Sequence, residues 1–365
     1  MSPGLELADL GWRAQDAAAF DPHARGGRTA GRVLAEDRGS YVAWTAVGER
    51  RAAVTGRFRY DAGEDPGAYP AVGDWIALDA TPEPAAIHAV LPRRSALIRQ
   101  AAGLRTAAQV VGANLDVVFV TSSLNADLNV RRLERYLATA WESGAEPVVL
   151  LSKADLVPTE EAAAALAAVE RLAVGTEVIL ASAYDGRGLD RVRERIAPGA
   201  TVAFVGSSGV GKSTLVNRLA GTDLALVREI REDDARGRHT TTRRELHLLP
   251  DGGLVLDTPG MRELALWDGD GLDRSFADVE ELAASCRFGN CRHAGEPGCA
   301  IAAALVDGRL TADRHGAWQK LVREARHQER RTDARARNEE RRRWKQIGKA
   351  VARHMDAKYG EDGWR

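Results

Sequence analysis

One short segment combines glycines, a lysine and a hydroxyl group in the spacing of a phosphate-binding loop. Residues 206–213 read Gly-Ser-Ser-Gly-Val-Gly-Lys-Ser and fit the pattern G-x-x-x-x-G-K-[ST] at every fixed position. The glycines let successive backbone N–H groups face phosphate oxygens at the start of a helix, where Lys212 would reach the outer phosphates and Ser213 would bind Mg²⁺. A glycine-rich turn with a chance lysine is the weaker alternative, because an apolar strand precedes the motif and a helical segment follows it. The residues predicted to hold the phosphates are Gly206, Ser207, Ser208, Gly209, Val210, Gly211, Lys212, Ser213 and Thr214.

A second phosphate-sensing motif lies downstream, at residues 257–260. The sequence Asp-Thr-Pro-Gly fits the pattern D-x-x-G and ends an apolar strand. In such motifs the aspartate, here Asp257, holds Mg²⁺ through a water, and the N–H of Gly260 would sense the terminal phosphate. The same four residues could form an ordinary turn, but their place after a phosphate-binding loop favours the functional interpretation.

The segment between these motifs predicts a loop that responds to the terminal phosphate. Residues 225–244 are polar and arginine-rich, and they contain Gly-Arg-His-Thr-Thr-Thr at positions 237–242. Such a loop needs a threonine to complete the Mg²⁺ shell, and we expect Thr241 or Thr242 to do this. Met261 stands where many GTPases carry a water-orienting glutamine, and an apolar side chain cannot orient water, so intrinsic hydrolysis should be slow. His239 is a candidate replacement, although a histidine on such a loop is equally able to contact a partner.

Residues that precede the phosphate loop are predicted to select the base. The segment at 152–155 ends an apolar strand and resembles the guanine-recognition motif N-K-x-D; its residues are Ser152, Lys153, Ala154 and Asp155. The Asp155 carboxylate would accept hydrogen bonds from guanine N1–H and the 2-amino group, a pair of donors that adenine lacks. Ser182 and Ala183 follow the next strand and match the short motif whose backbone N–H meets guanine O6. Serine replaces the usual asparagine at position 152, which puts the nucleotide affinity in question more than the base specificity.

The order of these motifs along the chain is itself informative. In ordinary small GTPases the phosphate loop comes first and the guanine-recognition motifs come last. Here residues 152–155 and 182–183 precede the loop at 206–213. This order indicates a circularly permuted GTPase domain, in which the chain that leaves Gly260 continues directly into the C-terminal part of the protein.

The C-terminal part contains a predicted metal site. All three cysteines of the chain fall within fourteen residues, and with one histidine they form the pattern Cys-x4-Cys-x-His-x5-Cys at Cys286, Cys291, His293 and Cys299. Three thiolates and one imidazole, with no open position, describe a structural tetrahedral Zn²⁺ site. Three core cysteines beside a surface histidine is the weaker alternative, and a redox dithiol is weaker still because no C-x-x-C is present.

The elements around these motifs predict a multidomain α/β protein. Residues 1–30 are weakly patterned and predict an N-terminal extension, and residues 31–100 contain short alternating runs at 31–35, 41–47, 52–58 and 74–78, typical of a five-stranded barrel of the OB type. Residues 110–268 alternate apolar strands with helices, as in a parallel sheet covered on both faces. Residues 275–365 are predicted to form a zinc-binding helical domain.

Composition restricts the setting of the protein. The chain has 365 residues, 44% of them hydrophobic, and a formal net charge of −1. The longest apolar run has eight residues (162–169), well short of the ~20 that a membrane-spanning helix needs. No secretory signal is visible. We therefore expect a cytoplasmic protein without a membrane partner. The net charge hides a basic run at 320–345, with eleven basic and five acidic residues. That run could be a solvated helix face, but its arginines together with Trp318 and Trp344 favour contact with RNA.

The small barrel, the permuted GTPase motifs and the cysteine pattern, in this order, resemble the RsgA (YjeQ) family of bacterial GTPases that depend on the small ribosomal subunit. The resemblance includes the segments at 99–103 and 109–120 and the Gly-Arg-His-Thr-Thr-Thr run. It implies a GTP hydrolase that acts in late maturation of the 30S subunit, contacts 16S rRNA, is stimulated by that subunit and helps to release a bound maturation factor. It also implies Mg²⁺ with GTP or GDP, one structural Zn²⁺ and a monomer. The alternatives are a zinc-dependent rRNA-binding protein that uses GTP as a structural or regulatory switch, and a P-loop ATPase or kinase.

Overall fold

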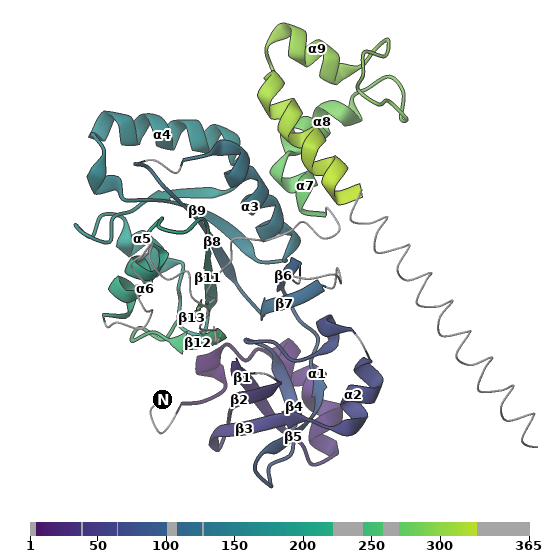
Figure 1. The fold of residues 1–365 in the computed structure, drawn as a ribbon, viewed down its shortest axis with the longest axis vertical. Coiled ribbons are helices and arrows are strands. Elements are labelled where there is room, and N and C mark those ends of the chain that lie inside the picture. The colour runs from purple at the N-terminus through teal and green to yellow at the C-terminus, as the bar shows by residue number, and fades with distance from the viewer. Residues whose placement is uncertain are drawn as a thin grey trace, which may run out of the picture.

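The computed structural model describes residues 5–37, 39–63, 65–100, 108–125, 128–221, 244–257 and 270–326. Figure 1 shows three parts: a barrel of strands with the N-terminal helix, a central sheet between two sets of helices, and a helical C-terminal region. This arrangement agrees with the predicted multidomain α/β architecture.

The N-terminal part is a closed five-stranded barrel. Its strands pair in the order β1-β2-β3-β5-β4, and β4 returns to pair with β1. Alternate side chains point inward, so that Val33, Ala43, Ile76 and Ile87 form its core. The strands are β1 (Thr29–Asp37), β2 (Ser40–Thr45), β3 (Gly48–Val54), β4 (Trp75–Leu78) and β5 (Ala85–Val90). This topology confirms the predicted OB-type barrel.

The barrel differs from the sequence prediction at two places. Residues 57–58 were expected in a strand, but β3 ends at Val54 because the Thr55 hydroxyl accepts a hydrogen bond from the Phe58 N–H and so caps helix α2 (Gly56–Ala62). Within the weakly patterned residues 1–30, the structure has η1 (Ala8–Leu10) and α1 (Ala14–Arg25). The Trp12 ring between them meets Trp75 edge to face at 4.6 Å, which fastens this segment to the barrel. A further single turn, η2 (Pro66–Ala68), precedes β4.

The central sheet has the strand order β10-β9-β8-β11-β13-β12, in which only the β12–β13 pairing is antiparallel. Its strands are β8 (Val117–Ser123), β9 (Glu146–Ser152), β10 (Glu177–Leu180), β11 (Thr201–Val205), β12 (Arg244–Leu248) and β13 (Leu254–Asp257). The connecting helices are α3 (Val130–Glu142), α4 (Thr159–Leu172), α5 (Leu189–Glu194) and α6 (Lys212–Ala220). This alternation of strands and helices agrees with the pattern predicted for residues 110–268.

Residues that alternate along the strands decide which face each helix covers. Val118 and Val120 of β8 pack with Leu133 and Leu137 of α3 in one apolar cluster, which α4 also joins. Phe119 belongs to the cluster on the opposite face, together with residues of α5 and α6. The central sheet is therefore buried on both faces, as its nearly continuous apolar strands predict.

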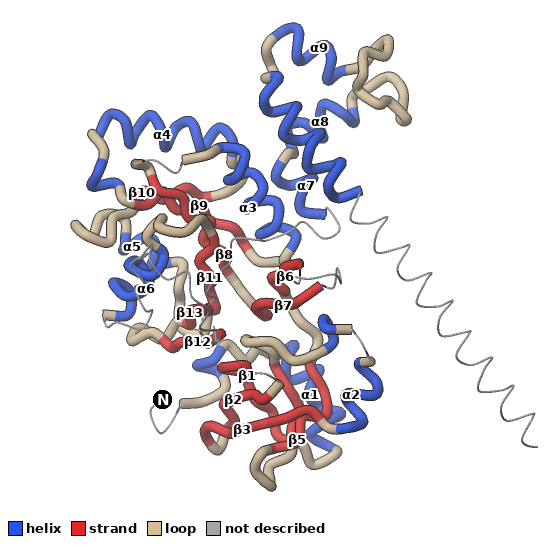
Figure 2. Tube along the Cα trace, viewed as in Figure 1, coloured by secondary structure: helices blue, strands red, loops and turns tan. Residues whose placement is uncertain are grey.

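The barrel and the central sheet are joined edge to edge. Strand β12 pairs not only with β13 but also with β1 of the barrel, where Ala35 lies opposite Glu245 and Glu36 lies opposite Arg244. In Figure 2 the red strands pass from the central sheet through β12 into the barrel. A separate hairpin of β6 (Ala96–Gln100) and β7 (Ala108–Ala113) lies between the two parts in sequence.

The C-terminal region is a small helical unit that rests on α3. It contains α7 (Asp270–Ser275), α8 (Ala277–Ala284), α9 (Ala300–Asp307) and a helix over residues 312–326. Helix α7 approaches α3 so closely that a Cβ at Gly271 would lie 2.0 Å from the Ala138 carbonyl oxygen. Arg314 anchors the last helix through the buried Glu134 of α3, 2.7 Å away. No helix among the described residues has the length and apolar character needed to cross a membrane.

Candidate nucleotide site and metal centre

The phosphate loop connects the end of β11 to the start of α6, as its sequence predicts. Three of its glycines have positive φ angles: 145° at Gly206, 78° at Gly209 and 94° at Gly211. At Gly206 a Cβ would also lie 2.1 Å from the Thr121 carbonyl oxygen. Glycine is therefore required there both by the backbone conformation and by the closeness of β8.

The cationic side chain of the loop lies over the loop itself. The Lys212 ammonium donates hydrogen bonds to the carbonyls of Gly206 and Ser207 at 2.8 and 2.6 Å. Lys212, Ser213 and Thr214 occupy the first turn of α6, whose N-terminus favours anions. The arrangement collects a positive charge, a helix N-terminus and a hydroxyl at the end of one buried strand, which suits a polyphosphate with Mg²⁺.

The segment that contains Asp155 is tied to the phosphate loop by its serine. Ser152 is 2% exposed, and its hydroxyl lies 2.6 Å from the Val210 carbonyl oxygen and 3.3 Å from that of Ser122. Lys153 has a left-handed backbone conformation, with φ 58°, which directs the chain into the turn η3 (Ala154–Leu156). A Cβ built on Gly211 would lie 3.9 Å from the Lys153 Cε, so the lysine stem extends toward the phosphate loop.

The predicted guanine-reading carboxylate is held by a second serine. The Ser182 hydroxyl donates a hydrogen bond of 2.6 Å to Asp155 Oδ1 and accepts bonds from the N–H groups of Tyr184 and Asp185. Because Ser182 is fully buried, this bond fixes the orientation of the carboxylate. Sequence reasoning assigned only a backbone role to Ser182 and Ala183. The sequence signal that could have indicated a side-chain role is the position of Ser182, just after the strand that pairs with the strand preceding Asp155.

The predicted phosphate-sensing residues lie largely outside the described part of the chain. Asp257 is the last residue of β13, which runs parallel to β11, so its backbone lies at the strand end next to the phosphate loop. Gly260, His239, Thr241 and Thr242 fall within 222–243 or 258–269, outside the described residues. Their predicted roles stay predictions.

The four predicted metal ligands converge in space. The donor atoms of Cys286, Cys291, His293 and Cys299 all lie within 4.8 Å of one another. His293 Nδ1 is 3.6 Å from the Cys286 sulfur and 3.7 Å from the Cys299 sulfur, and those two sulfurs are 4.0 Å apart. A tetrahedral zinc ion with Zn–S bonds of about 2.3 Å requires sulfur–sulfur distances of about 3.8 Å, so these residues fit the ion.

The protonation of the cysteines also fits a cation. Burial opposes ionisation of Cys286, but hydrogen bonds from the backbone N–H groups of Ala300 and Ile301 and from the other two cysteines together outweigh it, and the pKa of Cys286 is lowered. At Cys291 the His293 N–H lowers the pKa, yet burial and the two neighbouring cysteines raise it to about 11. The Cys291 thiol therefore does not ionise easily beside the other cysteines, whereas a divalent cation among the sulfurs would make the thiolates compatible.

Comparisons with known proteins agree with this geometry. The profile of the RsgA GTPase family matches residues 90–267. The small ribosomal subunit biogenesis GTPase RsgA of Streptomyces avermitilis is 43% identical over 359 residues, which cover 98% of this chain and 96% of the relative. The small ribosomal subunit biogenesis GTPase RsgA 2 of Lactiplantibacillus plantarum is 48% identical over 303 residues, 83% of this chain and 85% of the relative. The chain belongs to the RsgA GTPase family.

Solved structures show the same fold. YjeQ from Thermotoga maritima superposes with a TM-score of 0.61 at 23% identity, covering 82% of this chain and 98% of that one. YloQ, described as a circularly permuted GTPase, superposes with a TM-score of 0.60 at 23% identity, covering 82% of this chain and 96% of that one. These matches confirm the permuted GTPase fold that the order of the motifs predicts.

One expectation about the C-terminal region of this RsgA family member is wrong. Trp318 was expected to contribute an aromatic surface for RNA, but it is 8% exposed and belongs to the apolar cluster of the helical unit. Its indole N–H donates to Glu280 at 2.8 Å, and its ring meets His293 edge to face at 5.6 Å. Trp318 therefore supports the loop that carries the four predicted metal ligands. Trp344 and most of the basic run lie outside the described residues.

Proposed function

We propose that this protein hydrolyses GTP during late maturation of the small ribosomal subunit, slowly alone and faster on the 30S particle, and that it helps to release a bound maturation factor. The GTP assignment rests on the Asp155 carboxylate. A hydrogen bond from Ser182 fixes this carboxylate, and a hydrogen bond from Ser152 ties the segment that contains Asp155 to the phosphate loop. The names of the relatives, small ribosomal subunit biogenesis GTPase, support the small ribosomal subunit as a partner, and contact with its 16S rRNA is part of the proposal. A cytoplasmic monomer is part of the proposal.

Each residue of the nucleotide site is assigned a role according to its position. Asp155 would read guanine N1–H and the 2-amino group, with Lys153 over the base and the Ala183 backbone near O6. Lys212 and the loop N–H groups would orient the β- and γ-phosphates, and Ser213 with Asp257 would hold Mg²⁺, which neutralises charge that develops on the phosphates. Thr241 or Thr242 would complete the Mg²⁺ shell. Because Met261 cannot orient water, we assign that task to His239 on the ribosome.

The metal centre has a structural role in this proposal. Cys286, Cys291, His293 and Cys299 would hold one Zn²⁺ with no ligand position left for substrate. The ion would fix the loop of residues 286–299 on α8 and α9, next to Trp318.

The test is the rate of phosphate release from GTP by the full-length protein, with and without purified 30S subunits, and with ATP as the control nucleotide. We expect a rise of about 100-fold or more with 30S, since one well-placed general base contributes that much. ATP should give no stimulated turnover. Equal rates with and without 30S would contradict the proposal and favour a protein that uses GTP only as a switch.

A second measurement separates binding from catalysis. His239→Ala should still pellet with 30S subunits but lose the stimulated turnover. If the variant hydrolyses GTP on 30S as fast as the wild-type protein, His239 has no catalytic role.

A further inference from the structure

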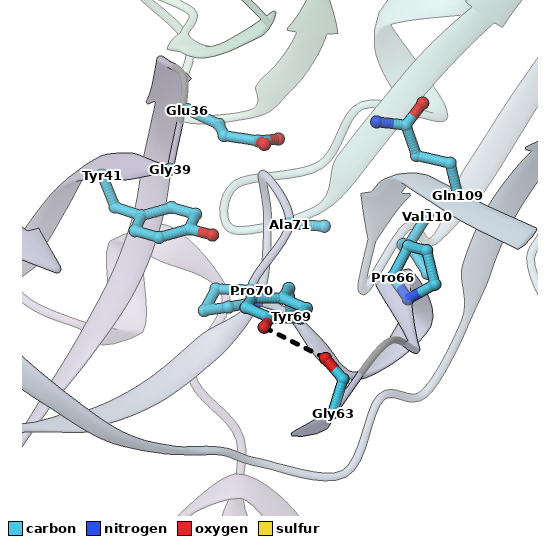
Figure 3. A pocket seen from close by; sticks show the side chains of 10 residues that line it. All are labelled: Glu36, Gly39, Tyr41, Gly63, Pro66, Tyr69, Pro70, Ala71, Gln109 and Val110. Carbon is cyan, nitrogen blue, oxygen red and sulfur yellow. Dashed lines mark hydrogen bonds between the residues drawn. The ribbon is translucent and has the colours of Figure 1, made fainter. Parts of the chain in front are cut away.

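A cavity of about 290 Å³ lies where the barrel meets the β6–β7 hairpin, and no step of GTP hydrolysis uses it. Its walls come from β1 and β2, from the segment around η2 and from β7; the residues that give it its chemistry are Glu36, Tyr41, Tyr69, Pro70, Gln109 and Val110. We call it the barrel cavity. In Figure 3 the Tyr41 hydroxyl and the Glu36 carboxylate point toward its interior, and the rings of Tyr69 and Pro70 lie below them.

The walls of the barrel cavity are flat and held in place. Tyr41 is 3% exposed, so its ring is fixed by the barrel core while its hydroxyl faces the cavity. Tyr69 packs edge to face on Phe58, with ring centres 5.9 Å apart, and its hydroxyl donates to the Gly63 carbonyl at 3.4 Å. Fixed aromatic and proline rings form a stacking surface for a planar guest, with little conformational entropy left to lose.

The charges around the barrel cavity restrict what that guest can be. Arg244 Nη1 lies 3.5 Å from Glu36 Oε2, a long contact that leaves the carboxylate able to accept further hydrogen bonds. Arg99 is close enough to act on both groups, and its Nε donates to the Gln109 side chain at 3.1 Å. Burial and the charge of Arg99 lower the pKa of Arg244. Two arginines beside one carboxylate disfavour a cationic guest and favour one that carries both N–H donors and a negative charge.

We propose that the barrel cavity is a second nucleotide site, distinct from the phosphate loop. This second site would bind a single unstacked guanine nucleotide. The base would lie against Tyr69 and Pro70, and its N1–H and 2-amino groups would donate to Glu36. Guanine is the only common base with an N–H and an amino group side by side on one edge, the pair that a carboxylate accepts. The phosphate would face Arg99 and Arg244.

The barrel cavity lies beside the pairing that joins the barrel to the central sheet, so a bound guest would affect that pairing. Glu36 and Arg244 face each other at the β1–β12 pairing, where the barrel joins the central sheet. A base bonded to Glu36 competes with Arg244 for the same carboxylate and frees that guanidinium for the phosphate. The guest therefore binds at the joint between the two parts.

The nucleotide can come from RNA or from solution, and only the RNA source rests on the proposed ribosomal function. The test uses the full-length protein with Mg²⁺ and one equivalent of GDP, at a protein concentration well above the dissociation constant for GDP, so that the phosphate-loop site is filled and little free GDP remains to occupy the barrel cavity. Fluorescein-labelled single-stranded hexaribonucleotides, one all-adenine and one with a single central guanine, are titrated by fluorescence anisotropy. We expect the guanine hexamer to bind about tenfold more tightly or better, since two hydrogen bonds to a charged group distinguish the bases.

Two variants assign this preference to the barrel cavity. Glu36→Gln places a donor opposite the guanine donors and should abolish the preference. Tyr41→Phe keeps the ring but removes the hydroxyl that points into the cavity and would hydrogen-bond to the guest, so it should weaken binding of the guanine hexamer several-fold. Glu49→Gln, on the exposed part of β3, is the matched control and should behave as the wild-type protein. If Glu36→Gln lowers the melting temperature, Tyr41→Phe carries the test, because it removes only one hydroxyl.

Each outcome decides a question. A wild-type protein that does not prefer guanine, or Glu36→Gln and Tyr41→Phe variants that bind like the wild type, would overturn the proposal. If GMP displaces the guanine hexamer, the site accepts a free nucleotide; if millimolar GMP does not, the source is RNA. This test does not measure turnover on 30S subunits, so it is independent of the proposed function. A guanine preference without 30S stimulation would support the cavity site and contradict the proposed function. Stimulation by 30S without a guanine preference would support the proposed function and contradict the cavity site.

Discussion

The nucleotide loops and the cysteine loop are fixed by different means. The ends of β9 and β11 are buried, as are the two residues that follow β10, and hydrogen bonds from Ser152 and Ser182 connect the loops at these strand ends. In the cysteine loop, by contrast, most residues between Cys286 and Cys299 are exposed, and the loop has no apolar core of its own. The first site can therefore form before its ligand binds, whereas we expect the second to depend on its metal.

The largest expected effect tests the cysteine loop. Cys286→Ser should remove the bound zinc, which is expected at one ion per chain, and unfold residues 286–299, because about 10–16 kcal/mol of apparent zinc affinity acts as folding energy in such sites. GDP affinity should stay unchanged. Zinc content by atomic absorption and GDP titration on the same sample are the measurements, with Ser285→Ala as the matched control. Absence of zinc from the wild-type protein would contradict the metal site.

The next effect tests the nucleotide site. Asp155→Asn replaces one acceptor with a donor, so GTP affinity should fall by about 100-fold or more through the loss of charge-assisted hydrogen bonds of ~1.5–3 kcal/mol each. Affinity for xanthosine triphosphate, whose base carries an oxygen in place of the amino group, should rise. Competition of both nucleotides with labelled GDP measures this. A variant that keeps the wild-type preference for GTP would show that the base lies elsewhere.

A third prediction concerns the contact between helix α3, which covers the central sheet, and the C-terminal helical unit that carries the cysteine loop. Arg314 binds Glu134, which is 2% exposed, and also Asp278, and its guanidinium lies 4.3 Å from the centre of the Phe276 ring. Arg314→Met should destabilise the C-terminal unit by about 3–5 kcal/mol, because it leaves a buried carboxylate unpaired. Adding Glu134→Leu should restore most of this loss. Arg131→Met breaks an exposed pair with Asp313 and should cost about 1 kcal/mol or less in urea unfolding.

The smallest effect tests the link between the two nucleotide loops. Ser152→Ala removes the hydrogen bond to the Val210 carbonyl and should weaken GDP binding by about 5- to 10-fold, the equivalent of ~1–1.5 kcal/mol, without changing the preference for guanine. Ser95→Ala removes a buried bond of the same length to Leu115 away from the site and is the control. A changed base preference would show that Ser152 takes part in discrimination.

The features that the sequence predicted are those with local signals. The barrel strands, the buried strands of the central sheet and the phosphate loop each have a periodicity or a spacing that identifies them, and the order of the motifs predicted the permutation. Long-range contacts left no such signal. Neither the pairing of Glu36 with Arg244 nor the burial of Trp318 can be deduced from neighbours in sequence, because each depends on a partner from a distant element. Helix α1 was missed because the packing of its Phe20 against Trp12 and the core cluster that contains Trp75, not its weak pattern, stabilises it.

Hydrogen exchange on the full-length protein, with and without a zinc chelator, tests the central distinction between a site fixed by the sheet and a loop fixed by metal. Removal of zinc should increase exchange in residues 286–299 and leave residues 152–155, 182–183 and 206–214 at their original protection. Loss of protection in both regions together would contradict the account, as would a cysteine loop that stays protected without zinc.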